Sequence, residues 1–152
     1  MATINATLSL ASSDLSSNPL ALTKTMTMTK AGTSNGLEFT SGLVRRKLTA
    51  TTQIDLVTTG AQMYGTPTAT TNANKLYIKN TGSSSTDFIT VGLGDATGGE
   101  ELDDGSSQIT LGKLYGGEWM IIPYHGATNV GDVLVKPSTA EATTIEWMLF
   151  FE

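Results

Sequence analysis

The feature that most constrains the fold of this chain is a hydrophobic pattern that repeats every second residue in short segments. Residues 3–10 alternate isoleucine, alanine and leucine with threonine, asparagine and serine. Residues 20–29 place leucines and methionines on one face, interrupted by Lys24, and threonines on the other. Because successive side chains of a strand point to opposite faces, this pattern predicts β-strands and argues against helices.

Similar short segments follow along the rest of the chain, and turn-forming residues separate them. They cover residues 43–49, 53–58, 75–80, 87–93, 108–111, 118–124, 132–136 and 143–151. The longest connection, residues 59–74, is rich in Thr, Ala, Gly and Asn and is expected to be a surface loop. About ten short strands at this spacing predict an all-β fold, either a sandwich or a barrel.

The aromatic residues divide the chain unequally. The first forty residues contain Phe39 but no Trp or Tyr, whereas six aromatic residues fall in the last forty. Aromatic side chains bury the most surface per residue, so the core is expected to lie in the later strands. Residues 1–35 are therefore predicted to form an N-terminal arm or a peripheral strand pair, and residues 37–152 a compact β-sandwich body.

The composition excludes several classes of function. The chain has 152 residues, no cysteine and one histidine, which argues against a disulfide scaffold, a thiolate nucleophile or a cysteine-rich zinc site. Nine Lys and Arg residues against 14 Asp and Glu residues give a net charge of −5, the opposite of what nucleic-acid binding requires. No secretory signal and no apolar run long enough to span a bilayer is evident. We expect neither nucleic acid nor membrane as a partner.

Three motifs suggest chemistry only superficially. Residues 99–107 contain four acids that could bind Ca²⁺, Glu100, Glu101, Asp103 and Asp104, but their spacing does not fit a helix–loop–helix calcium loop, so a solvated turn is favoured and calcium stays open. The glycines of residues 92–99 lack the following helix that a phosphate loop needs. His125 has no nucleophile motif for which it could act as a base. We therefore predict no enzymatic activity, no cofactor and no metal.

Two polar surfaces are candidates for contact with another protein. Arg45 and Lys47 share one face of a predicted strand, which indicates either pairing with acids on a partner or an edge strand protected by charge. Thr23, Thr25 and Thr27 share the polar face of residues 20–29, which suits neutral hydrogen bonds to a partner.

The C-terminal segment, residues 143–152, is apolar on both faces. Trp147 and Phe151 share one face with Ile145 and Leu149, and Met148 and Phe150 lie on the other. Such a strand is either central in a sandwich or buried between subunits. The second alternative makes Trp147, Met148, Phe150 and Phe151 a candidate subunit interface.

Several segments of the sequence together resemble a known group of proteins. They are the Thr-rich alternating strands of residues 1–32 around Asn18-Pro19-Leu20, and the segments KLYIKNTG (75–82), LGKLYGGEWM (111–120) and IEWMLFF (145–151). In these segments the chain resembles small virion structural proteins of tailed bacteriophages, in particular of phages that infect cyanobacteria and other aquatic bacteria.

The resemblance implies a capsid decoration, or cement, protein with an antiparallel β-sandwich of jelly-roll type. Such a protein is made in the host cytoplasm, forms homotrimers, and binds the major capsid protein on the outer surface of the virion. Two alternatives stay open: a tail, baseplate or fibre component, and a carbohydrate-binding sandwich for host attachment. The latter would use Trp119, Tyr124 or Tyr64 as exposed stacking platforms.

Overall fold

A computed structural model describes the greater part of the chain as strands and their tight connections. The described residues are 3–13, 20–29, 39–49, 51–57, 73–94, 102, 109–124, 132–139 and 143–151. The regular elements within these ranges are all β-strands, which confirms the predicted all-β class. None of these segments forms a helix that is long and apolar enough to cross a membrane.

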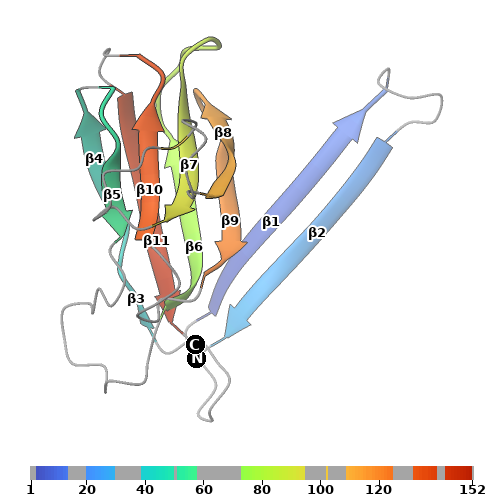
Figure 1. Ribbon diagram of the computed structural model, residues 1–152. Coiled ribbons are helices and arrows are strands. Elements are labelled where there is room, and N and C mark those ends of the chain that lie inside the picture. Colours follow the sequence, from blue (N-terminus) through green and yellow to red (C-terminus); the bar gives the residue numbers. More distant parts are fainter. Residues whose placement is uncertain are drawn as a thin grey trace. The chain divides into compact units, whose positions relative to one another are not determined.

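The chain divides into two compact units, Met1–Phe39 with Glu152, and Thr40–Phe151. The first contains a hairpin of β1 (Thr3–Ser12) and β2 (Leu20–Thr29), whose antiparallel register runs from Thr3 opposite Thr29 to Ser12 opposite Leu20 (Figure 1). The second unit is called the body here. The predicted role of residues 1–35 as an arm stays a prediction.

The body contains two antiparallel sheets. The strands of the first are β3 (Phe39–Thr40), β4 (Val44–Leu48), β6 (Ala73–Asn80), β9 (Trp119–Pro123) and β11 (Thr143–Phe151). Their order is β3-β11-β6-β9, and β4 also pairs with β11. The strands of the second are β5 (Ile54–Val57), β7 (Phe88–Gly94), β8 (Ile109–Tyr115) and β10 (Asp132–Pro137). Their order is β5-β10-β7-β8. We call them the β11 sheet and the β10 sheet.

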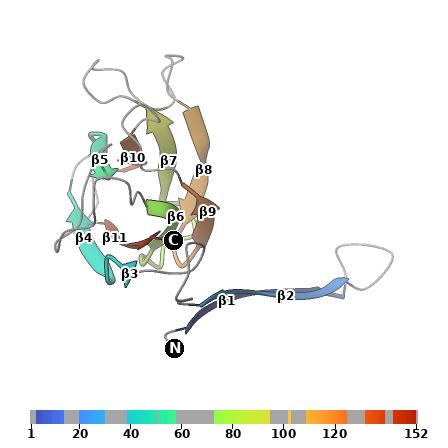
Figure 2. The same cartoon turned by 90° about the horizontal axis from the view of Figure 1, so that it is seen from below.

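The two sheets lie in two layers, and the predicted alternation places apolar side chains in the core (Figures 1 and 2). Buried residues of the β11 sheet are Leu48, Leu76, Ile78, Ile145 and Leu149, and those of the β10 sheet include Leu56, Ile89, Val91, Leu114, Val133 and Val135. Each is flanked along its strand by residues of the opposite face, as a period of two requires. The hydrophobic pattern therefore fixed which side of each sheet faces inward.

Polar and backbone groups join the sheets at one end of the body. The buried side chain of Asn80, at the end of β6, donates from Nδ2 to the Leu114 carbonyl of β8 at 3.1 Å and accepts from the Gly82 N–H at 2.9 Å. Its own carbonyl accepts from the Gly117 N–H at 2.9 Å. The Gly116 N–H donates to the backbone carbonyl of Ser84 at 3.0 Å. We call this contact between residues 80–84 and 114–117 the sheet joint.

The outer side of the β10 sheet is covered by a residue of the chain itself. Leu102 is fully buried, and its side chain lies directly over Gly92 of β7. Its N–H donates to Gln53 Oε1 at 2.7 Å, and its carbonyl accepts from Lys136 Nζ at 3.4 Å. Strand β10 is consequently buried on both faces, from Asp132 to Val135. This part of the β10 sheet is not open to a partner.

Candidate partner-binding face of the β11 sheet

The outer side of the β11 sheet carries a concentration of basic and aromatic side chains. They alternate along their strands with the core residues, and we call them the outer face: Arg45, Lys47, Lys75, Tyr77, Lys79, Trp119, Ile121, Thr144, Glu146 and Met148. Four of the nine basic residues of the chain belong to this set, together with a single acid, Glu146. The outer face is thus basic in a chain whose net charge is −5.

The strand register arranges the charged residues of the outer face in a row across the sheet. Glu146 of β11 is paired with Arg45 of β4 on one side and with Lys79 of β6 on the other. Lys79 is in turn paired with Trp119 of β9. Opposite charges on directly paired residues stabilise a sheet by about 0.2–1 kcal/mol per pair. Because this row draws on four strands, it forms only when the whole sheet has assembled.

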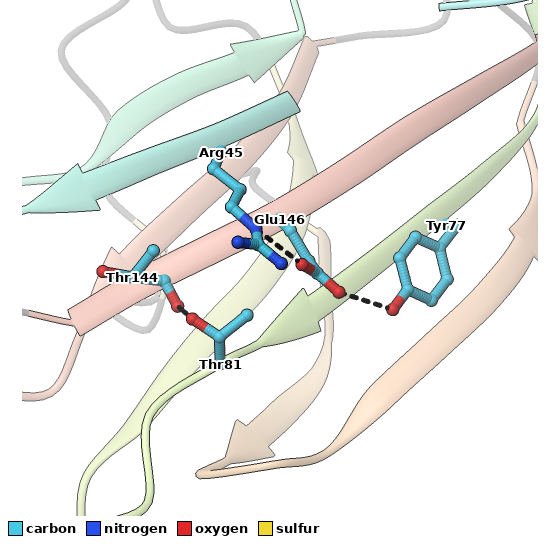
Figure 3. A network of polar contacts seen from close by, with 5 residues as sticks. All are labelled: Arg45, Tyr77, Thr81, Thr144 and Glu146. Carbon is cyan, nitrogen blue, oxygen red and sulfur yellow. Dashed lines mark hydrogen bonds and ion pairs between the residues drawn. The ribbon is translucent and has the colours of Figure 1, made fainter. Parts of the chain in front are cut away.

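Glu146 is the centre of a small network of polar contacts (Figure 3). Its carboxylate accepts from Arg45 Nε at 3.0 Å through Oε2 and from the Tyr77 hydroxyl at 3.1 Å through Oε1. Glu146 is only 7% exposed, so both partners are needed to offset the loss of its hydration. The same contacts hold Tyr77 beside Trp119, with ring centroids 6.3 Å apart and planes inclined at 42°.

The pKa of Tyr77 reflects this position. Burial of the phenol, followed by its hydrogen bond to Glu146 and the charge of that carboxylate, raises the pKa from 10.0 to about 12, whereas Arg45 acts in the opposite direction. The two contributions of Glu146 follow from the network, because the phenol must stay protonated to donate to the carboxylate. The phenol of Tyr77 therefore loses its proton at a higher pH than the phenol of a free tyrosine does.

This shift predicts a loss of stability in alkali. A folded-state pKa above the unfolded value means that the folded state holds the proton more tightly, so the stabilisation is complete below pH 10 and falls as the pH rises towards 12. We expect Tyr77→Phe to flatten the decline of the urea midpoint across this window. Tyr124→Phe should remove a separate part, because burial and then Asp132 raise the pKa of Tyr124. An unchanged slope in Tyr77→Phe would contradict the network.

The two sets of predicted capsid contacts lie in different units of the chain. Arg45 and Lys47 are exposed on the outer face. Thr23, Thr25 and Thr27 are exposed on the hairpin, and the hydroxyls of Thr23 and Thr25 lie 3.4 and 3.0 Å from those of Ser9 and Thr7 on the opposite strand. Contact of either set with a capsid stays a prediction.

The predicted subunit-interface residues differ in how accessible they are. Trp147 and Met148 are partly exposed, whereas Phe150 and Phe151 are only 3% and 1% exposed. Strand β11 lies between β4 and β6 and pairs with both, as a central strand does. Burial within one chain leaves Phe150 and Phe151 little surface to offer a partner. A subunit interface at β11 stays a prediction that rests on Trp147 and Met148.

The other candidate residues fall into three groups. Trp119 is 41% exposed and can stack on a ligand, whereas Tyr124 is buried and cannot. Tyr64, His125 and the acids of the predicted calcium loop, Glu100, Glu101, Asp103 and Asp104, lie outside the described residues. Within the described ranges, no three His, Asp or Glu side chains come together as metal ligands would.

A shallow depression borders the outer face next to β4. It has a volume of about 110 Å³ and is lined by Arg46, Lys47, Leu48, Thr49, Thr52 and Ile54. Sites for small organic ligands usually have about 300–1,000 Å³. The depression is too small for such a ligand.

The sequence contained part of the signal for the outer face. Lys75, Tyr77 and Lys79 alternate with Leu76 and Ile78, and so do Arg45 and Lys47 with their neighbours. The missing information was that β4 and β6 flank the same strand, β11. No protein-family model matches the chain and no curated protein matches it, so the function is proposed from the geometry of the outer face and from the sequence.

Proposed function

We propose that this chain is a non-enzymatic structural protein of a phage virion, a decoration protein that binds the outer surface of the assembled capsid and stabilises it. Its partner is the major capsid protein, and its place is the capsid surface. The observation that carries the proposal is the outer face of the β11 sheet, which is basic and polar and is built across four strands. Such a surface suits contact with a protein lattice.

The finer fold that goes with this proposal is a jelly roll. If β3 and β4 are counted together as the first of eight body strands, the order is 1-8-3-6 in the β11 sheet and 2-7-4-5 in the β10 sheet. Pairing of the first strand with the last, and of the second with the seventh, is the arrangement expected when a long antiparallel ribbon is rolled up. Jelly rolls are common in capsid and lectin domains, and this analogy supports the proposed role.

Binding of many copies explains how a modest contact would stabilise a shell. A protein that binds only the assembled lattice shifts the equilibrium towards assembly by mass action. Exposed ion pairs contribute about 0–1 kcal/mol each and are screened over about 8 Å at physiological ionic strength. Arg45 and Lys47 therefore supply the salt-dependent part of binding, and neutral and apolar contacts supply the remainder.

The proposal predicts how attachment responds to salt. Purified protein is added to capsids that lack it, and bound protein is measured after sedimentation. We expect a severalfold increase in NaCl to reduce affinity about tenfold, and R45Q/K47Q to flatten this dependence. Lys113→Gln, an exposed lysine of the β10 sheet, is the matched control and should keep the original slope.

Two outcomes would contradict this proposal. Complete release at moderate salt would mean that charge dominates the contact. Absence of binding, with the protein located in tails by immunolabelling of virions, would favour the tail, baseplate or fibre alternative.

Carbohydrate binding is a second candidate, favoured by one observation. Trp119 is 41% exposed next to Tyr77, and Lys79 is paired with it on the neighbouring strand. An exposed aromatic ring flanked by a cation suits a saccharide that carries an acidic group. Binding to purified host polysaccharide that is lost in Trp119→Ala, without binding to capsids, would replace the decoration proposal with host attachment.

A further inference from the structure

Strand β4 carries positive charge on both of its faces. Arg45 and Lys47 lie on the outer face, and Arg46 lies between them on the side that faces the core, paired with the buried Ile145. All three basic residues are nevertheless exposed, and so is Val44, which precedes them. A charged residue on the inward side of a strand is typical of the edge of a sheet, where the side chain can reach solvent.

The second edge of β4 is open in the described part of the chain. β4 is paired with β11 over its five residues without a break in register, and no other described strand pairs with it. The other edge strands of the body are less regular. The pairings of β5 and β8 each contain a register shift, β3 has two residues, and β9 ends in Pro123, which has no N–H to donate. Of these strands, β4 is best suited to accept a further strand.

The charged row across the outer face ends with a cation at this open edge. From β6 to β4 the row consists of Lys79, Glu146 and Arg45, so the sign of the charge changes at each strand. Arg45 Nε donates to Glu146 at 3.0 Å, while 68% of the Arg45 side chain stays exposed (Figure 3). Neighbouring strands lie about 4.7–4.9 Å apart, so the next position of the row is one strand beyond β4. An acid at that position continues the alternation of charge.

The two other cations of β4 favour the same chemistry. Among the described residues, no acid lies within ion-pair distance of Arg46 or Lys47. Both residues line the depression of about 110 Å³ beside β4, and so do Thr49 and Thr52. A space of this size holds a few non-hydrogen atoms, as many as the carboxylate group of one side chain has. Its cations and hydroxyls are suitable partners for such a group.

We propose that the open edge of β4 binds an extended acidic segment of a partner protein by strand addition. The main chain of the segment pairs with β4, and carboxylates at three consecutive positions face Lys47, Arg46 and Arg45 on alternating sides. The inference rests on the proposed function for the identity of the partner, which is the major capsid protein.

The charges of β4 determine which strands can be added. Lysine and arginine on an edge strand normally prevent pairing with another chain. A second copy that offered its own β4 would place three cations against three. A strand with acids at these positions forms pairs of opposite charge instead. The same residues therefore exclude the β4 of a second copy and select an acidic partner.

A synthetic peptide tests this inference without capsids. The probe is acetyl-TVEEEVT-amide. One control is the lysine peptide acetyl-TVKKKVT-amide, and the other is the probe with its three glutamate nitrogens methylated, which keeps the charges but removes the N–H donors. In fluorescence anisotropy at low salt, we expect each control to bind at least about ten times more weakly than the probe, because it lacks either the charges or the main-chain hydrogen bonds.

Variants of β4 distinguish strand addition from docking on the outer face alone. R46Q should weaken binding of the probe about threefold, as R45Q should, because strand addition uses both faces of β4. Hydrogen exchange measured by NMR should show that the bound probe protects alternate amides of residues 44–48, those that β11 leaves free. K113Q, an exposed position of the β10 sheet, is the matched control and should bind the probe as the wild type does.

Two results would overturn the inference: equal binding of the three peptides, and binding of the probe without protection of the β4 amides. Capsid attachment that an excess of the probe does not reduce would also overturn it, while leaving the proposed function in place. Conversely, protection of the β4 amides by the probe in a protein that attaches to no capsid would support strand addition and remove the proposed function.

Discussion

Gly116→Ala is expected to destabilise the body by about 2–4 kcal/mol, because the sheet joint leaves no room for a methyl group. A Cβ atom at this position would lie 2.6 Å from both the nitrogen and the oxygen of Ser84 and 2.8 Å from the carbonyl carbon of Ser83. These are backbone atoms, which cannot rotate away as a side chain can. Relief of the clash would break the Gly116–Ser84 hydrogen bond of 3.0 Å.

Gly112→Ala is the matched control for this substitution. Gly112 lies in β8, the strand that immediately precedes Gly116, and nothing lies within 4 Å of a Cβ placed there. Alanine at such a site restricts the unfolded chain, so we expect no loss of stability and a gain of up to about 1 kcal/mol. Both variants are compared by urea unfolding monitored through tryptophan fluorescence. Equal destabilisation by the two would refute the close packing of the sheet joint.

Asn80→Asp is the second substitution with a large expected effect, about 2–4 kcal/mol at neutral pH. Asn80 is buried and donates from Nδ2 to the Leu114 carbonyl at 3.1 Å. A carboxylate has no proton to donate, so its second oxygen would face the carbonyl oxygen. Burial next to an acceptor favours the protonated acid, which raises the pKa of the new carboxyl group in the folded state.

The direction of the pH dependence follows from this raised pKa. Stability of Asn80→Asp should approach that of the wild type below the pKa of a free carboxyl, about 4, and should be lost as the pH rises through the folded-state pKa. Ser85→Asp introduces the same charge at an exposed position and should show no such loss. Urea midpoints measured from acid to neutral pH distinguish the two. Parallel curves would contradict a buried donor role for Asn80.

The strands could be predicted from the sequence because their signal is local. Alternation along residues 3–10, 20–29 and 143–151 depends only on neighbours in the chain, and these segments correspond to β1, β2 and β11. The neighbours of each strand could not be predicted, because Arg45 and Glu146 are paired across 101 residues. Phe39–Thr40, a strand of two residues, is too short to show a period.

The sheet joint illustrates the same limit for packing. Residues 75–82 and 111–120 are two of the segments on which the resemblance rests, and strand β7 lies between them in sequence. Their Asn and Gly residues predict turns when each segment is read alone. Only the fold brings Asn80 against Gly117 and Ser84 against Gly116. The burial of Leu102 could not be predicted either, because it is a single leucine between acidic residues and belongs to no periodic pattern.

The place of β11 in the sheet has a consequence for how the body folds during synthesis. β11 is the last of the described strands of the body to leave the ribosome, yet it lies between β4 and β6, which are made much earlier. Among the described strands β4 pairs only with β11, so until β11 arrives the charged row across the outer face cannot form. Pairing of strands so distant in sequence is slow, typically milliseconds to seconds. The nascent body therefore spends most of its synthesis with unpaired strand edges, the state in which β-proteins depend most on chaperones.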